Sequence, residues 1–391
     1  MAWSLERHPD PADGGRGSAR PMHVPNESRA RRLPPFARRA AAVLAVGVAA
    51  AFGACSDDDD PTGLASAQLP RPDSQMQAVL EQLARIAPRP LETLTPAEAR
   101  LQPSFADAFK QVLLAQGRDT AAAALVPGVT AADRTIAAPG VPALPVRVYT
   151  PSGTGPFPVV VYYHGGGWVI ATNATYDASP RTLASLARAV VVSVEYRKGP
   201  ENRFPAAHDD ALAAYRWVIA NARTIAGDST RVALAGESAG GNLAVATAVA
   251  AQGAGLRRPA HVVAVYPIAQ ADTTTPSYAQ NANARPLNRA LIGYFARNYT
   301  RTPADLLDPR ISLTRAALAG LPAVTIVNAE IDPLRSDGDL LEQALRAAGV
   351  SVERRVYDGV THEFFGMGAL VPDARAAEEY AAGRLRGAFG N

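Results

Sequence analysis

The chain has a single cysteine, Cys55, among its 391 residues. One cysteine excludes an intramolecular disulfide and any metal site built from cysteine thiolates. A basic domain is missing too: the net charge is +3, and residues 1–54 alone hold eight Arg against four acidic residues. The remainder is close to neutral, so the composition excludes an electrostatic nucleic-acid-binding domain.

Long apolar runs are scarce as well. One stands out, AAAVLAVGVAAAFGA at residues 40–54, and it follows Arg38 and Arg39. Its 15 residues are too few to span a bilayer comfortably, but they suit the apolar region of a secretory signal. Cys55 follows this run directly, and four consecutive aspartates come after one serine.

The position of the cysteine predicts a bacterial lipoprotein signal over residues 1–55, in which cleavage before Cys55 exposes a thiol that receives lipid. Residues 56–75 would then form a linker. The alternative is an ordinary signal peptide that contains a cysteine, and Met22 is an alternative start to Met1. In each case we expect an exported protein, either periplasmic or held at a membrane by its lipid.

The rest of the chain has the composition of a folded enzyme, because the sequence is 48% hydrophobic and 19% charged. Residues 76–125 carry apolar residues at helical spacing. From residue 126 to 391, short β-rich runs alternate with helical patterns, and several runs are continuously apolar, as in strands buried on both faces. The alternation predicts an α/β fold with a mostly parallel central sheet flanked by helices.

The expected strands include 144–150, 158–164, 189–196, 231–237, 260–267 and 323–330, and the expected helices include 179–188, 204–223, 239–252, 336–349 and 373–389. Residues 272–315 interrupt this alternation with polar, proline-containing sequence and one helical pattern. They predict an excursion above the sheet.

A serine stands between one such strand and the next helix. The segment VALAGESAGGN places Ser238 at the turn, with small residues on both sides. A nucleophile at such a turn projects above the sheet on a strained backbone, and its neighbours must be small so that strand and helix can approach. The G-x-S-x-G motif meets both requirements. The N–H of Ala239, at the helix start, would point toward an oxyanion formed on a group attached to Ser238. The alternative is a plain glycine-rich turn.

Three glycines follow the strand VVVYY in the motif HGGGW, residues 164–168. Consecutive glycines are entropically costly, and they make sense where backbone N–H groups approach a ligand closely. Gly166 and Gly167 could supply two donors to an oxyanion beside Ala239. The alternatives are a flexible loop or a phosphate cradle, but the phosphate-binding glycine patterns are absent.

Six histidines are candidates for the base that a serine nucleophile needs. His362 lies in the loop DGVTHEFFGM after an expected strand and beyond the serine, so we expect it to be the base. The others have ordinary explanations: His8 and His23 precede the apolar run, His164 belongs to the glycine loop, His208 lies in a helix and His261 opens a strand.

The carboxylate that orients this histidine should lie between Ser238 and His362. Asp332 follows the expected strand 323–330 and precedes a proline, at the edge of the sheet where the other candidates gather. Asp337 and Asp339 have the positions of helix-start acids. Glu330 stays open as the alternative, because it is only two residues from Asp332.

Five segments together resemble a known family. HGGGW, EYRKGPENRFPAAHDD, GESAGGN, EIDPLRSDG and DGVTHEFFGM, in this order, are similar to the bacterial hormone-sensitive-lipase family of α/β-hydrolases. The resemblance covers residues 75–390. It implies an α/β-hydrolase fold with an N-terminal helical cap, here residues 76–125, hydrolysis of carboxylic esters, mostly of short acyl chains, and no cofactor. We expect residues 272–315 to help cover the site, substrates with short to medium acyl chains, and no metal.

The resemblance also implies the site residues. Ser238 would be the nucleophile, Asp332 the acid and His362 the base, with Gly166, Gly167 and Ala239 as the oxyanion hole. His164, Gly165 and Glu237 would support the motifs; Glu237 stands where many members have Asp. Trp168 and Tyr196 are candidate pocket walls. Lys198 and Gly199 replace the usual Leu-Ala, and a lipoprotein-like signal is not typical of the family.

Three other functions remain open. The same residues could hydrolyse another acyl bond in a lactone, carbamate or amide, or act as a lipase on long-chain esters. The third alternative is not an enzyme: a lipoprotein that keeps the fold but only binds a ligand. Such a protein has no need of a catalytic base. The expected partner is a small ester, with no nucleic acid, and the sequence does not indicate an oligomeric state.

Overall fold

The computed structural model describes residues 69–390, and its centre is an eight-stranded sheet in the order β1-β2-β4-β3-β5-β6-β7-β8. The strands are β1 (Val129–Ile136), β2 (Leu144–Pro151), β3 (Phe157–Tyr163), β4 (Val190–Val194), β5 (Gly227–Glu237), β6 (Val262–Val265), β7 (Val324–Ile331) and β8 (Val352–Thr361). Only the β1–β2 and β2–β4 pairs are antiparallel. The predicted α/β fold with a mostly parallel sheet is thus confirmed.

The central strands are buried on both faces. Every residue of β3 and β4 is buried, as their valine-rich runs predicted. β1 differs: six of its eight residues are exposed, and it pairs with β2 alone at the edge of the sheet. The sequence analysis missed β1 because an exposed edge strand carries no continuous apolar run.

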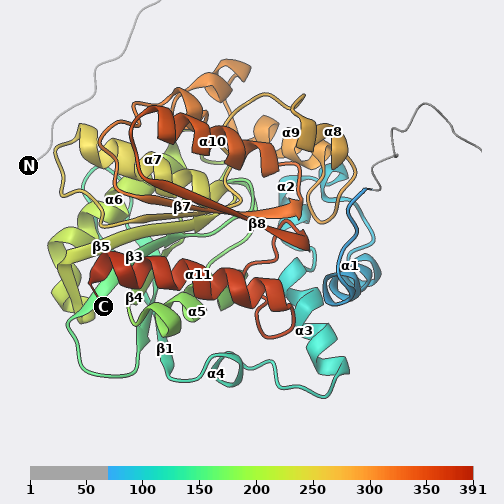
Figure 1. Cartoon of the computed structure of the whole chain (residues 1–391), viewed down its shortest axis with the longest axis horizontal. Helices are drawn as coiled ribbons and strands as arrows, with labels where there is room; N and C mark the ends of the chain where they lie inside the picture. The colour runs from blue at the N-terminus through green and yellow to red at the C-terminus, as the bar shows by residue number, and fades with distance from the viewer. Residues whose placement is uncertain (1–68, 391) are drawn as a thin grey trace, which may run out of the picture. The chain divides into compact units, whose positions relative to one another are not determined.

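Helices cover both faces of the sheet (Figure 1). On one face lie α6 (Ala206–Asn221), α7 (Ala239–Gly253) and α10 (Arg335–Ala347); on the other lie α5 (Ala178–Ala187) and α11 (Pro372–Phe389). Side chains of a strand alternate between faces, so Val159 and Val161 of β3 join the first core while Val160 and Tyr162 join the second.

Shorter helices gather beside the ends of the β7 and β8 arrows, at the right of Figure 1. They are α1 (Ser74–Ile86), α2 (Pro96–Arg100), α3 (Phe105–Ala115), α8 (Pro276–Gln280) and α9 (Arg289–Tyr299); α4 (Ala122–Leu125) precedes β1. Short 3₁₀ turns occur at η1 (Leu91–Thr93), η2 (Ala222–Ile225), η3 (Pro303–Leu307) and η4 (Leu313–Arg315). The excursion at residues 272–315 therefore contains α8 as well as the one expected helix, α9.

Side-chain caps fix where the N-terminal helices begin. The Asp73 carboxylate accepts from the Met76 N–H at 2.7 Å and starts α1. Thr95 and Ser104 each form a capping box, with Glu98 and Asp107 respectively. These reciprocal bonds satisfy the free N–H groups of a first helical turn, so short helices persist here.

The predictions for residues 1–55, including lipidation of Cys55, lie outside the described residues, as does most of the linker predicted at 56–75. Between residues 69 and 390, no helix combines the length and the apolar character that crossing a membrane requires.

Candidate active site

The register of the parallel strands brings the candidate residues to one edge of the sheet. Because the carboxyl ends of parallel strands point the same way, the residues that follow them meet there. The residues that directly follow β3, β5, β7 and β8 are His164, Ser238, Asp332 and His362. Ile331 and Thr361 are partners in the β7–β8 ladder, which sets Asp332 next to His362.

The turn that carries Ser238 is strained. Its φ of 55° and ψ of −118° lie outside the helical and strand regions, an unusual conformation for a non-glycine residue. A Cβ on Gly236 would overlap the carbonyl of Gly240, and a Cβ on Gly240 would overlap the carbonyl of Tyr163. Strand β5 and helix α7 can therefore approach each other only with glycine at both positions, which explains the motif.

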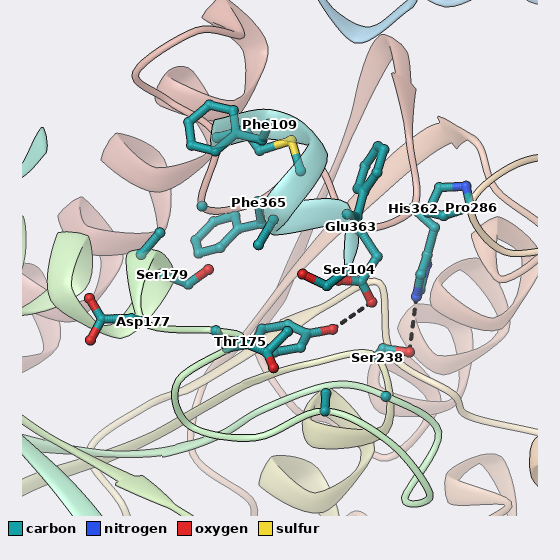
Figure 2. A pocket seen from close by; sticks show the side chains of 18 of the residues that line it. Ser104, Phe109, Thr175, Asp177, Ser179, Ser238, Pro286, His362, Glu363 and Phe365 are labelled. Atoms are coloured by element: carbon teal, nitrogen blue, oxygen red, sulfur yellow. Dashed lines mark hydrogen bonds between the residues drawn. The ribbon is translucent and has the colours of Figure 1, made fainter. Parts of the chain in front are cut away.

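Ser238, His362 and Asp332 form one hydrogen-bonded chain. The Ser238 Oγ lies 3.0 Å from His362 Nε2, a bond drawn in Figure 2, and His362 Nδ1 lies 2.7 Å from Asp332 Oδ2. The other Asp332 oxygen accepts from the Leu334 N–H at 2.8 Å. Since Asp332 accepts at Nδ1, the proton of the neutral ring belongs there, and Nε2 is left to accept the serine proton.

The geometry separates Asp332 from its alternatives. Glu330, which the sequence left open, turns its carboxylate to the Gly359 N–H at 2.9 Å. Asp337 accepts from the backbone of Ala269 and Gln270. Asp339 pairs with an arginine of β8. None of these three bonds the histidine in the described structure.

The surroundings of His362 tune its charge. Burial lowers the pKa of His362, but the Asp332 charge and hydrogen bond outweigh it, and the charge of Glu363 adds to them. The net pKa lies above its ordinary value. A histidine held in this way is a stronger base than a free one, because a positive ring is stabilised where it forms.

Three backbone N–H groups, two in the cavity that contains Ser238 and one directly after Ser238, bond no acceptor among residues 69–390. Gly166 and Gly167 have φ of 98° and 59°, and they line one cavity together with Ser238 and His362. Within residues 69–390 no protein acceptor bonds the N–H of either glycine. Ala239 is the first residue of α7, so its N–H has no partner inside the helix. The arrangement can hold a negative oxygen beside the serine.

A family model of the α/β-hydrolase fold matches residues 160–366. The chain belongs to this family. The match confirms the resemblance to the hormone-sensitive-lipase-like hydrolases that the five motifs indicated. The matched segment runs from β3 to the loop after β8 and thus contains every residue of the site described above.

Relatives with curated names include a carboxylesterase, NlhH, of Mycobacterium tuberculosis. It is 40% identical over 258 residues, which are 65% of this chain and 81% of that protein. An ethyl acetate hydrolase of Pseudomonas putida is 38% identical over 238 residues, 59% of this chain and 74% of that protein.

Solved structures agree. A thermostable esterase from Pseudomonas putida ECU1011 aligns with a TM-score of 0.73 at 32% identity, covering 82% of this chain and 98% of that one. A hyperthermophilic esterase from Pyrobaculum calidifontis aligns with a TM-score of 0.72 at 33% identity, covering 81% and 98%.

Each glycine of the HGGGW loop in this hydrolase is required by a close neighbour. A Cβ on Gly165 would overlap the Tyr176 hydroxyl, one on Gly166 the Ile170 carbonyl, and one on Gly167 the Phe295 ring. Each of the three glycines is therefore in close contact with a neighbouring segment, which explains why no side chain fits at these positions.

His164 supports this loop and does not act on a proton. Its Nδ1 lies 2.7 Å from the Gly165 carbonyl, and the Tyr196 ring stacks on it with centroids 4.3 Å apart. Burial lowers the pKa of His164 to about 4, so the ring is neutral at pH 7. The Nδ1–H of neutral His164 donates to the Gly165 carbonyl, and this hydrogen bond helps to fix the conformation of the glycine loop.

The prediction that Trp168 and Tyr196 form pocket walls is wrong. Neither side chain lines the cavity. Trp168 is buried and stacks on Tyr299 of α9, with centroids 4.8 Å apart. Tyr196 is buried behind the glycine loop, where its hydroxyl donates to the His164 carbonyl at 2.9 Å. A large aromatic next to a motif fits the core as readily as a pocket, and the sequence pattern cannot separate the two.

Glu237 lies beneath the serine turn as a neutral, hydrogen-bonded acid. The hydroxyls of Tyr162 and Tyr266 donate to its two oxygens. Burial raises the pKa of Glu237 to about 8, although hydrogen bonds from Ser179 and from both tyrosines lower it. The Tyr266 ring in turn packs against His362, with centroids 4.4 Å apart. Glu237 thus supports the base through Tyr266.

Ser238 and His362 open into a cavity of about 650 Å³. Figure 2 shows it running from Ser238 and His362 past Phe365 and Phe109 toward Asp177. We call residues 164–169, 199, 238–240, 332 and 362 the floor, and α1 to α3 with α9 the roof. The apolar lining includes Leu83, Phe105, Phe109, Leu287, Leu291, Phe295, Phe365 and Met367.

One arginine ties the roof to the floor. Arg100, at the end of α2, donates to the Val169 carbonyl at 2.9 Å and to the Gly199 carbonyl at 2.6 Å, and it pairs with Glu201 at 2.7 Å. The unusual Lys198-Gly199 pair is accommodated here, because Lys198 pairs with Glu195.

The sequence analysis missed Arg100, Tyr176 and Glu363. Glu363 stands in a quoted motif directly after the base, so its position was a usable signal. Arg100 and Tyr176 carry none. No group of three His, Cys, Asp or Glu placed to hold a metal ion occurs in the part of the chain that the structure describes.

Proposed function

We propose that this chain is a serine carboxylesterase that hydrolyses short- to medium-chain carboxylic esters through an acyl-enzyme on Ser238. One observation carries the proposal: Ser238 and His362, hydrogen-bonded in a chain with Asp332, share a cavity with Gly166 and Gly167, and Ala239 follows Ser238 as the first residue of α7. Relatives named carboxylesterase and ethyl acetate hydrolase support the ester as substrate class.

In the first half of the reaction, His362 Nε2 takes the Ser238 proton while Oγ attacks the ester carbonyl. The oxygen becomes an oxyanion held by the three N–H groups, and His362 then protonates the leaving alcohol. Asp332 stabilises the positive ring. Each oxyanion donor of this kind is worth about 2.7–4 kcal/mol of barrier.

In the second half, His362 activates a water molecule, which attacks the acyl-enzyme. The same oxyanion donors stabilise the second tetrahedral intermediate, and Ser238 regains its proton as the acid leaves. We further propose that α1 to α4 and residues 272–315 act as a cap that sets the acyl size. Their lining of the cavity and the Arg100 contacts support this role.

The test is a p-nitrophenyl ester series from acetate to palmitate, with the purified chain and Ser238→Ala side by side. We expect turnover of the short and medium esters and its loss in the variant. A best rate on palmitate would instead favour a lipase. A folded protein that turns over no ester of the series would rule out the carboxylesterase.

We also infer that the chain is exported and anchored through lipid on Cys55. The motif of an apolar run, Cys55 and a polar tether supports this inference. Metabolic labelling with a palmitate analogue tests it: wild type should carry label in the membrane fraction, and Cys55→Ser should be unlabelled. A wild type without label, but still exported, would leave an ordinary signal peptide.

A further inference from the structure

Glu363, the residue after the base, has an unusual backbone. Its φ is 71°, in the left-handed region that glycine or asparagine usually occupies. Such a conformation costs free energy and persists where surrounding structure holds it, most often at functional sites. Here it turns the Glu363 side chain into the cavity, and Figure 2 shows that side chain between Ser104 and His362.

The Glu363 carboxylate is held by one oxygen only. The Tyr176 hydroxyl donates to Oε1. Tyr176 is itself buried, and it has room only because residue 165 of the loop is glycine. No Lys or Arg of the described chain pairs with Glu363, and Oε2 has no hydrogen-bond donor among residues 69–390. A partly buried carboxylate without a cation is unusual, because burial of an unpaired charge is costly.

The other carboxylates of the cavity differ in how many of their oxygens are bonded. Asp177 accepts from Tyr149 and pairs with Arg181. Glu378 accepts from two backbone N–H groups of the 366–368 segment. Glu92 accepts from a roof asparagine at 2.9 Å. Glu92 and Glu378 are likewise bonded through one oxygen only, so a free oxygen alone does not set Glu363 apart. Its position does, because Glu363 directly follows the base His362 and lines the cavity into which Ser238 opens.

We propose that Glu363 forms a substrate subsite beside Ser238 that binds a cationic group of the ester, an ammonium above all. The inference rests on the proposed esterase function and names its substrate class. Tyr176 fixes one carboxylate oxygen, and the free oxygen receives the substrate cation. Esters that carry a carboxylate at the same position are repelled.

Cations of the rim do not reverse this selection. Lys110, Arg285 and Arg375 line the cavity and make no ion pair within the described chain, but all three are exposed to solvent. Water and salt screen exposed charges strongly, whereas a partly buried carboxylate acts at short range. The rim therefore has less influence on the bound ester than Glu363 has.

The test compares isosteric esters that differ in charge. Ethyl 3-aminopropanoate, ethyl butanoate and monoethyl succinate place an ammonium, a methyl and a carboxylate at one point of the acyl chain. Butyrylcholine and 3,3-dimethylbutyl butyrate form a matched pair on the alcohol side. Because burial raises the pKa of Glu363 above its ordinary value, the assays are run at pH 8.

The readout is the ratio of kcat/KM for the cationic ester to that for its neutral isostere. We expect a ratio above one on at least one side of the ester, and a fall of about tenfold in Glu363→Gln, the size of one charge-assisted hydrogen bond. The ratio for monoethyl succinate should rise by a similar factor. Using ratios removes any change in the basicity of His362.

Glu92→Gln is the matched control, because it removes a carboxylate that lines the same cavity from another segment, η1, and is also bonded through one oxygen. It should leave the ratios unchanged. Ratios near one in wild type on both sides would overturn the proposal, as would an equal loss in Glu92→Gln. If Glu363→Gln does not fold, Glu363→Asp keeps the charge, and the wild-type ratios still decide. Turnover of neutral esters without charge preference defeats this inference alone; no turnover of any ester defeats the proposed function as well.

Discussion

The floor and the roof of the cavity are built in different ways. On the floor, Ser238, His362 and Asp332 are 5%, 3% and 0% exposed, and each directly follows a strand of the sheet. The roof helices are joined to the rest by side chains: α1 and α3 share a core with one face of the sheet, and Tyr299 of α9 stacks on Trp168. At the roof surface, Leu101 and Leu114 are 83% and 57% exposed. The floor is thus fixed by strand register and backbone fit, whereas the roof is held by side-chain packing and by the Arg100 hydrogen bonds.

The largest expected effect tests the floor. Asp332→Asn should lower kcat by about 10⁴-fold, because an amide no longer selects the Nδ1–H tautomer or stabilises the positive ring. The matched control is Glu330→Gln, two residues away. The Glu330 carboxylate accepts a hydrogen bond from the Gly359 N–H and makes no bond to His362. This variant should cost less than about tenfold. Equal losses in steady-state kinetics would mean that the geometry assigns the wrong acid.

Two glycines of helix α7 test whether close backbone packing fixes the floor, through the free energy of unfolding of their alanine variants. Gly240→Ala should lower the free energy of unfolding by about 3 kcal/mol, since its Cβ would overlap the Tyr163 and His164 carbonyls. Gly253→Ala, at the other end of α7 with no atom near its Cβ, should raise it by about 0.5 kcal/mol. Urea titration measures both, and a tolerated Gly240→Ala would contradict the steric origin of the motif.

The floor and the roof also differ in how much of each could be predicted from the sequence. Ser238, His362 and the glycines of the floor were found because each needs a particular residue at a particular strand end. Glu330 could be separated from Asp332 only when the β7–β8 register was known. Glu363 and Tyr176 meet through space from segments 187 residues apart, which no local pattern encodes. Trp168 was misassigned because an aromatic serves core and pocket alike.

The acid beneath the floor should make stability depend on pH. Glu237 keeps its proton in the folded chain up to about pH 8, whereas its ordinary pKa is 4.5. Its contribution to folding is therefore complete below pH 4.5 and is lost as the pH rises through 8. Glu237→Gln should remove a slope of up to about 1.4 kcal/mol per pH unit in this window.

Chemical denaturation from pH 5 to pH 8 compares the two proteins, and the tyrosine hydroxyls can still donate to the amide oxygen of the variant. Parallel stability curves for wild type and Glu237→Gln would show that Glu237 is already ionised in the folded chain. The hydrogen bonds from Tyr162 and Tyr266 would then support a charge, and the neutral floor inferred here would be wrong.

The smallest effect concerns the link between roof and floor. Arg100→Ala removes the bonds to the Val169 and Gly199 carbonyls, and we expect about 1 kcal/mol less stability with KM raised several-fold and kcat nearly unchanged. Arg85→Ala, which removes an exposed pair with Glu81, should change neither. If kcat falls instead while KM holds, Arg100 acts on the glycine loop and its oxyanion donors. The roof would then belong to the catalytic machinery, and the division between the two regions would fail at this residue.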